Sequence, residues 1–265
     1  MKIKEIKALI LDMDGVLWKG DQPIGNLAYT FKLIEASGWK FSLVTNNATR
    51  TISQYAHKLN GFGVDVKVEQ IINSSVAAGY YLQKRFPGGG NIYVIGESGL
   101  VNTLAEYGFI HDDQNVLAVV AGMDRELTYD KLARATQLIR SGAHFVATNP
   151  DKTFPTPEGL VPGAGAILAS IQAATDTDPV IVGKPSPRMY QIALMRMNVH
   201  QANTLVIGDR LETDIAAGQE LGCMTALLLS GVTRKDQISQ WSPPPDIVAA
   251  DISTLIHEIT EKRHN

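Results

Sequence analysis

The chain has 265 residues, of which 45% are hydrophobic and 19% charged, and its formal net charge at pH 7 is −3. This balance is typical of a globular protein with a sizeable core, and the length suits one large domain or a domain carrying a smaller one. The weak negative charge excludes a general attraction to nucleic acid or anionic lipid, so we expect neither a nucleic-acid polymer nor a membrane as partner.

The cysteine content bears on the compartment. Cys223 is the single cysteine, so no internal disulfide can form, and its apolar sequence neighbours favour a packed thiol over a nucleophile. No apolar stretch approaches the length of a membrane-spanning helix. We therefore expect a soluble, cytoplasmic protein.

Strand-like and helix-like segments alternate along the chain, a pattern typical of an α/β fold with a mainly parallel sheet. The first strand ends in an acidic turn. The apolar and periodic segments of this part predict strands over 8–11 and 41–44 and helices over 26–37, 51–60 and 74–86. The run from Pro87 to Gly90 is then the clearest break in the chain.

A second set of strand and helix segments follows the break. It predicts strands over 92–95, 117–121 and 145–147, and helices over 100–107, 129–141 and 165–174. Strands over 180–182, 204–207, 225–229 and 246–248 then continue the first set. We interpret this as a doubly wound, Rossmann-like core of residues 1–85 and 180–265, with a smaller α/β cap domain of residues 86–179 inserted into it.

Two carboxylates follow the first predicted strand. Successive strand side chains alternate between faces, so Asp12 and Asp14 point to the same side while Met13 turns away. Such a pair in water-poor surroundings is costly unless a cation lies between the carboxylates or one of them is protonated. The pair therefore suggests chemistry, although a lone acidic pair after a strand is more often a solvated turn.

Other predicted strand exits also carry polar side chains, namely Thr45, Asn46 and Asn47, then Lys184, then Asp209 with Asp214. Ligands of open α/β sheets bind outside the carboxyl ends of the strands, so we expect these residues to share one crevice. Carboxylates facing a lysine suit a hard divalent cation, such as Mg²⁺, together with a phosphate. The histidines are scattered without ligand spacing, which argues against a zinc site.

Each of these positions has a plainer alternative. Thr45 and Asn46 alone would fit a helix N-cap, and Asp214 alone would fit a favourable charge in a first helical turn. Lys184 alone would more often be a surface lysine. The joint occurrence of such residues at several strand exits favours the functional interpretation.

Four motifs occur in the order of the haloacid dehalogenase-like (HAD) phosphatases: Asp12-Met13-Asp14-Gly15-Val16, Thr45-Asn46-Asn47, Lys184-Pro185 and Gly208-Asp209-Arg210-Leu211-Glu212-Thr213-Asp214. The chain resembles their NagD-like branch, in which a large α/β cap lies between the threonine and lysine motifs. The similarity spans essentially the whole chain, and four ordered motifs are far more specific than one. Ala48 departs from the family, whose members often carry a hydroxyl there.

The resemblance implies a Mg²⁺-dependent phosphatase that hydrolyses small phosphate monoesters, such as nucleotides, sugar phosphates or phosphoglycolate, through an aspartyl-phosphate. Asp12 would be the nucleophile, and Asp14 would be the general acid and then the general base. Lys184 would neutralise charge on both the phosphoryl group and Asp12. The sequence does not choose among the substrates.

The resemblance also implies the residues that bind phosphate and metal. Thr45, the backbone N–H of Asn46 and, beside them, Asn47 would hold phosphate oxygens together with Lys184. The Mg²⁺ ligands would be Asp12, the backbone carbonyl of Asp14 and Asp209, with Asp214 orienting them.

The cap holds further candidates. Asn149 and Asp151 follow a predicted strand and are candidate substrate-binding residues, with plain turn chemistry as the alternative. Glu97 follows a segment similar to the Asp209 motif but has no acid five positions on, so it should be structural or substrate-facing. Arg50 would contact either the substrate or a surface acid. The cap is also where we expect any homodimer to form.

Two alternative functions stay open. A phosphotransferase or mutase would pass the phosphoryl group from the same aspartyl-phosphate to a sugar hydroxyl. The second alternative is a non-catalytic phosphometabolite-binding protein or a receiver-like switch, and Asp14 disfavours the switch, since a base so near the nucleophile shortens the life of an acyl phosphate. Dehalogenation is the least expected activity because it needs neither Mg²⁺ nor Asp14.

Overall fold

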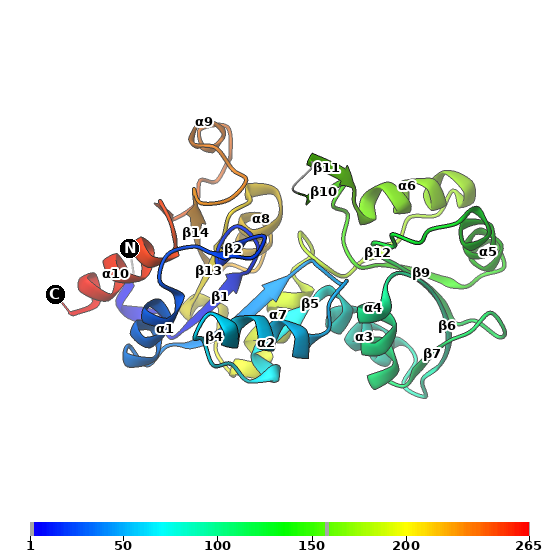
Figure 1. Cartoon of the computed structure of the whole chain (residues 1–265), viewed down its shortest axis with the longest axis horizontal. Helices are drawn as coiled ribbons and strands as arrows, with labels where there is room; N and C mark the ends of the chain where they lie inside the picture. Colours follow the sequence, from blue (N-terminus) through cyan, green and yellow to red (C-terminus); the bar gives the residue numbers. More distant parts are fainter. Residues whose placement is uncertain (1–2, 157–158, 265) are drawn as a thin grey trace. The chain divides into compact units, whose positions relative to one another are not determined.

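The structure is a computed structural model that describes residues 3–156 and 159–264 (Figure 1). These residues form two compact units. The first unit contains the chain up to Thr45, Ile52–Ile72 and the chain from Tyr190 onward, and the second contains Asn46–Thr51 and Asn73–Met189. Both units are built on a parallel sheet with helices between the strands, which confirms the predicted α/β class. The division into a core of residues 1–85 and 180–265 and a cap of residues 86–179 stays a prediction.

The first sheet has six strands in the order β15-β14-β13-β1-β4-β5. They are β1 (Ala8–Asp12), β4 (Lys40–Thr45), β5 (Ile71–Asn73), β13 (Thr204–Gly208), β14 (Met224–Leu228) and β15 (Ile247–Ala249). Strand β1 pairs in parallel with β4 on one side and β13 on the other. The strands that follow β1 first in the chain, β4 and β5, lie on one side of it, and the later strands β13, β14 and β15 lie on the other. The strand order thus reverses at β1, and sheets of this kind bind ligands at such a switch point.

The sequence explains why β1 lies at the centre. Residues 8–11 are apolar and fully buried, as expected for a parallel strand covered on both faces. The helices that accompany this sheet are α1 (Leu27–Ala36), α2 (Ile52–Gly61), α8 (Ala216–Glu220), α9 (Lys235–Ile238) and α10 (Ile252–His264). Helix α1 begins where predicted because the side chain of Asn26 accepts a hydrogen bond from the Tyr29 N–H at 3.0 Å.

The second sheet has five strands in the order β12-β9-β8-β6-β7. They are β6 (Gly90–Ile95), β7 (Phe109–His111), β8 (Ala118–Ala121), β9 (His144–Ala147) and β12 (Val180–Ile181). The same unit contains α3 (Ser74–Arg85), α4 (Ser98–Glu106), α5 (Tyr129–Arg140), α6 (Ala164–Thr175) and the hairpin of β10 (Thr153–Thr156) and β11 (Gly159–Pro162). A separate hydrophobic core, including Val119, Phe145 and Ile171, stabilises it.

One predicted strand joins a different sheet from the one expected. The sequence predicts the strand over 180–182 in the first sheet, which is wrong, because β12 pairs with β9, with Val180 beside Val146 and Ile181 beside Ala147. A short β-branched run fits the edge of either parallel sheet, so its local pattern cannot identify its partner. Lys184 therefore follows a strand of the second sheet. Helix α7 (Arg188–Met197) comes next.

Several short elements of the structure are not predicted from the sequence. These are β5, β7, the β10–β11 hairpin and the two-residue strands β2 (Trp18–Lys19) and β3 (Gln22–Pro23). Such short strands carry too few residues to show a period. Within the described part of the chain, no helix has both the length and the apolar character needed to cross a membrane.

Candidate functional site

Two aspartates meet at the switch point of the first sheet. Asp12 is the last residue of β1, and Asp209 directly follows β13, its neighbour, in which Ile207 lies beside Leu11. The parallel register therefore brings both carboxylates to the same edge of the sheet. Asp12 is 7% exposed and Asp209 is 2% exposed, so both acids are buried.

Asp214 reaches the same edge from a wide helical turn. It lies in the π-helical segment Leu211–Ile215 and is 1% exposed. Its carboxylate accepts hydrogen bonds from the Arg210 N–H at 3.2 Å and from the Tyr190 hydroxyl at 3.3 Å. A Cβ at position 208 would overlap the Asp214 side chain. Gly208 is thus needed for the turn to fold back over the strand end.

The hydroxyl of Tyr190 is held in its protonated form. Tyr190 is 1% exposed, and burial, with the nearby charges of Asp214 and Asp12, raises its pKa well above the ordinary value. Tyr190 therefore acts as a hydrogen-bond donor to Asp214 at neutral pH. A single tyrosine within a helix gives no local signal of such a role, so the sequence does not predict this residue as part of the site.

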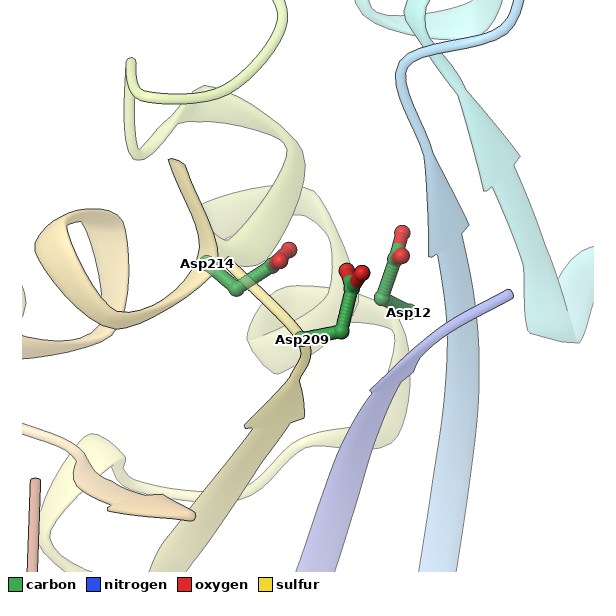
Figure 2. A group of neighbouring side chains, drawn as sticks. All are labelled: Asp12, Asp209 and Asp214. Carbon is green, nitrogen blue, oxygen red and sulfur yellow. The ribbon is translucent and has the colours of Figure 1, made fainter. Parts of the chain in front are cut away.

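The three acids form a candidate cation site. One carboxylate oxygen each from Asp12, Asp209 and Asp214 can be chosen so that all lie within 4.8 Å of one another, and Figure 2 shows the three side chains pointing toward a common region. Three buried carboxylates this close repel one another strongly unless a cation neutralises them. Oxygen donors alone suit a hard cation such as Mg²⁺. The donor set therefore fits the ion that the sequence predicts.

Asp209 is fixed by its backbone surroundings. Its Oδ2 accepts a hydrogen bond from the Val232 N–H at 2.7 Å. A Cβ added to Gly15 or to Gly231 would overlap the Asp209 carboxylate. The carboxylate thus lies against two glycines, and only residues without a side chain leave room for it. Gly231 is a second residue that the sequence analysis missed.

Asp14 has a different environment from the three acids. It is exposed, and its Oδ1 accepts a hydrogen bond from the buried indole N–H of Trp18 at 2.8 Å. Met13 between the two aspartates is fully buried. The side chain of Asp14 is therefore oriented by Trp18 and does not belong to the carboxylate cluster. Its backbone carbonyl as a metal ligand stays a prediction.

Thr45 lies at the same edge of the first sheet as Asp12. It is the last residue of β4, is 2% exposed and follows Val44, which lies beside Asp12. Asn47, which the sequence also predicts in phosphate binding, uses its side chain locally: Oδ1 accepts hydrogen bonds from the Thr49 N–H at 3.0 Å and the Thr49 hydroxyl at 2.7 Å. This Asx turn shapes the loop after β4.

The second unit brings together the other predicted residues. Lys184 is 3% exposed, and its N–H donates to the Asn46 side chain at 2.7 Å. The Asn46 amide donates to Asp151 Oδ2 at 3.2 Å, and the Asn149 amide donates to the Asn46 carbonyl at 2.9 Å. Asn46, Asn149, Asp151 and Lys184 are therefore one hydrogen-bonded group. That this group and the carboxylate cluster serve one reaction stays a prediction.

The remaining candidates have structural partners. Both carboxylate oxygens of Glu97 accept hydrogen bonds from Arg125, at 2.5 and 2.7 Å, and Glu97 is not in the carboxylate cluster. Arg50 is exposed, which leaves both of its alternatives open. Burial raises the pKa of the Cys223 thiol to about 12, so the prediction of a packed, unreactive thiol is supported.

Comparison with known proteins agrees with this geometry. A model of haloacid dehalogenase-like hydrolases matches residues 9–110, and a HAD-hydrolase-like model matches residues 181–255. The chain is 33% identical over 258 residues to an acid sugar phosphatase of Staphylococcus saprophyticus, an alignment that covers 97% of this chain and 99% of that protein.

Solved structures are similar over the same length. NagD from E. coli K-12 has a TM-score of 0.86 at 33% identity, covering 94% of this chain and 97% of that one. A glycerol phosphate phosphatase from Mycobacterium tuberculosis in complex with magnesium has a TM-score of 0.89 at 31% identity, covering 96% of this chain and 78% of that one.

Proposed function

Because this chain belongs to the haloacid dehalogenase-like hydrolases and is similar to NagD over nearly its whole length, we propose that it is a Mg²⁺-dependent phosphatase. It hydrolyses small phosphate monoesters through an aspartyl-phosphate on Asp12. The names of its relatives, an acid sugar phosphatase and a glycerol phosphate phosphatase, support phosphoric monoester hydrolysis and a small polyol or sugar phosphate as substrate.

The observation that carries the proposal is the convergence of Asp12, Asp209 and Asp214. One carboxylate oxygen of each lies within 4.8 Å of those of the other two, in a buried position. Such a cluster is costly to build for stability alone, since each buried charge loses its hydration. A bound divalent cation offsets this repulsion and, when present, polarises a phosphoryl oxygen as a Lewis acid. The glycerol phosphate phosphatase from Mycobacterium tuberculosis is solved with magnesium and also with calcium, which supports a hard divalent cation at this site.

Asp12 and Asp14 divide the chemistry between them. A carboxylate oxygen of Asp12 attacks phosphorus, the bond from phosphorus to the leaving oxygen breaks, and Asp14 gives that oxygen a proton. Asp14 then takes a proton from water as the water attacks phosphorus, and the phosphorus–Asp12 bond breaks to restore the carboxylate. The exposed, Trp18-oriented side chain of Asp14 suits a group that exchanges protons with substrate and water.

The other residues hold charge in place. In this proposal Thr45, the Asn46 N–H, Asn47 and Lys184 bind the phosphoryl oxygens, and the Lys184 ammonium offsets the charge that accumulates there. Fixed positive groups aimed at a transferring phosphoryl group account for most of the catalysis of such reactions. The cytoplasm is the proposed compartment, in keeping with a single buried thiol.

The test is a panel of phosphomonoesters containing sugar, glycerol, nucleoside, glycolate and p-nitrophenyl phosphates. With Mg²⁺ and no acceptor alcohol, the protein should release inorganic phosphate. A chelator should stop the release, and added Mg²⁺ should restore it. Dependence on an acceptor alcohol would favour the phosphotransferase, and a phosphoenzyme stable for minutes would favour a receiver-like switch.

The nucleophile is tested by Asp12→Asn. This variant should fold and show no detectable phosphatase activity, because an amide oxygen does not form the acyl phosphate. The matched control is Asp21→Asn, whose exposed carboxylate pairs with Lys58 at 3.2 Å and should be dispensable. Wild-type turnover in Asp12→Asn would refute the assignment.

A further inference from the structure

The loop that leaves β9 is bound to the loop that leaves β4. Asn149 is 6% exposed, and its amide donates to the main-chain carbonyl of Asn46 at 2.9 Å. The same carbonyl accepts a hydrogen bond from the Ser74 hydroxyl at 2.6 Å. Asn149 Oδ1 accepts the Asp151 N–H at 3.1 Å. One buried asparagine thus connects the residue after Thr45 with the loop that carries Asp151.

The side chain of Asn46 pairs with the main chain of Lys184 at two points. Asn46 Oδ1 accepts the Lys184 N–H at 2.7 Å, and Asn46 Nδ2 donates to the Lys184 carbonyl at 3.0 Å. The second amide proton goes to Asp151 Oδ2, 3.2 Å from the nitrogen. A primary amide has two N–H donors, so both are used. This arrangement fixes the orientation of the Asn46 amide and, through it, the backbone of Lys184.

Backbone contacts bring the Lys184 segment to this position. The ladder between β12 and β9 continues past the strand ends, because the Val182 N–H donates to the Ala147 carbonyl at 3.0 Å and the Gly183 N–H to the Thr148 carbonyl at 2.8 Å. A Cβ at position 183 would overlap the Thr148 carbonyl. The close approach of the two loops therefore requires glycine directly before Lys184.

We propose that Asn149 and Asp151 are positioning residues for Lys184, acting through Asn46. The inference rests on the proposed function, in which the Lys184 ammonium offsets charge on the phosphoryl group. Asn149 holds the Asn46 backbone, and Asp151 holds the Asn46 amide that clamps Lys184. Their task is then to place the ammonium and not to contact the leaving group, whereas the sequence makes them candidate substrate-binding residues.

The two roles have different kinetic consequences. The phosphoryl group is the same in every substrate, so a displaced ammonium lowers the rate by the same factor whatever alcohol leaves. A residue that contacts the leaving group affects each substrate differently. Electrostatic stabilisation depends on a fixed geometry, and a displacement of about 1 Å costs up to about 100-fold in rate.

The experiment compares Asn149→Ala, Asp151→Ala and Asp151→Asn with the wild-type enzyme. The values of kcat and KM are measured with p-nitrophenyl, glycerol and sugar phosphates, and the inhibition constant of inorganic phosphate is measured with Mg²⁺ present. Asn91→Ala is the matched control, because Asn91 in the same unit also donates its amide to a main-chain carbonyl, that of Gln114, at 2.8 Å.

Both alanine variants should lower kcat by about 10- to 100-fold, by a common factor for all three substrates. Inorganic phosphate should inhibit them more weakly. Asp151→Asn should recover part of the loss, since its amide oxygen still accepts the Asn46 proton. Asn91→Ala should match the wild type. A thermal melt of each variant ensures that folded protein is compared, and Asn149→Ser replaces the alanine variant if that one unfolds.

Two results would overturn the proposal. One is a loss that differs among leaving groups and appears in KM, with phosphate inhibition unchanged, since that is the pattern of direct substrate contact. The other is wild-type kinetics in both alanine variants. A wild-type protein without phosphatase activity would instead overturn the proposed function, and calorimetric binding of inorganic phosphate to the same variants would then judge the positioning role.

Discussion

The hydrogen bond from Trp18 to Asp14 gives the sharpest test of the proposed acid–base chemistry. Trp18 is 1% exposed, and its indole N–H donates to Asp14 Oδ1 at 2.8 Å. Its ring packs near Phe62, with ring centroids 6.0 Å apart, and Lys58 Nζ lies 4.6 Å from the ring centroid. Trp18→Phe removes the donor but keeps an aromatic ring at the site, so the orientation of Asp14 is the main thing that changes.

The expected magnitude follows from the contribution of one hydrogen bond to orienting Asp14. A hydrogen bond contributes about 0.5–1.5 kcal/mol, which corresponds to about 2- to 13-fold in rate if all of it orients Asp14 in the transition state. The loss should depend on the leaving group. The alkoxide that leaves from glycerol phosphate needs a proton, whereas p-nitrophenolate is stable without one. Only the alkyl phosphate should therefore show the full loss of rate.

The assay is kcat/KM for glycerol phosphate and for p-nitrophenyl phosphate, because this ratio reports the step that forms the aspartyl-phosphate. Trp39→Phe is the control: Trp39 is 4% exposed and donates its indole N–H to the Ile6 carbonyl at 3.1 Å. Both variants should lower the free energy of unfolding. The loss should be smaller than that of a Trp→Ala change, which is about 3–5 kcal/mol. If Trp18→Phe lowered kcat/KM by the same factor for glycerol phosphate and for p-nitrophenyl phosphate, the role of Asp14 as general acid would be refuted.

Three further predictions concern the metal site and the thiol. Gly231→Ala should abolish activity and weaken Mg²⁺ binding in calorimetry, because its Cβ would overlap the carboxylate of Asp209, whereas Gly61→Ala, with open space around it, should behave as wild type. Tyr190→Phe should weaken Mg²⁺ binding by about 10-fold, since it removes a hydrogen bond to a proposed metal-site carboxylate; unchanged affinity would show that the hydroxyl does not orient it. Cys223, whose pKa burial raises to about 12, should not react with a thiol reagent at pH 8 until urea unfolds the protein; rapid labelling of the native enzyme would contradict its burial.

Much of the first unit could be predicted from the sequence. The apolar run before Asp12 predicts a buried strand, and the acids after it and after the strand at 204–207 predict a shared sheet edge. Asp12 and Asp209 do lie at that edge, with a carboxylate oxygen of each within 4.8 Å of the other. Local patterns suffice here because each acid directly follows its own strand, and parallel strands present their carboxyl ends together.

The position of Asp214 was only partly predictable. Its spacing from Asp209 matches a known motif, but the π-helical turn that returns its side chain over Gly208 depends on packing against a strand that is already in place. Trp18 and Tyr190, which orient Asp14 and Asp214, had no signal in the sequence. An aromatic residue in an apolar segment looks the same whether its polar atom has a functional partner or a structural one.

The sequence by itself determined the α/β class, the order of the motifs and the acids that meet at the first sheet, since these depend on periodicity and on residues next to strand ends. The tertiary structure alone decided that β12 joins the second sheet and that Asn46 clamps Lys184. Both outcomes depend on hydrogen bonds between segments far apart in the chain. Such pairings are selected by the packing of the whole unit, and no local pattern of residues encodes them.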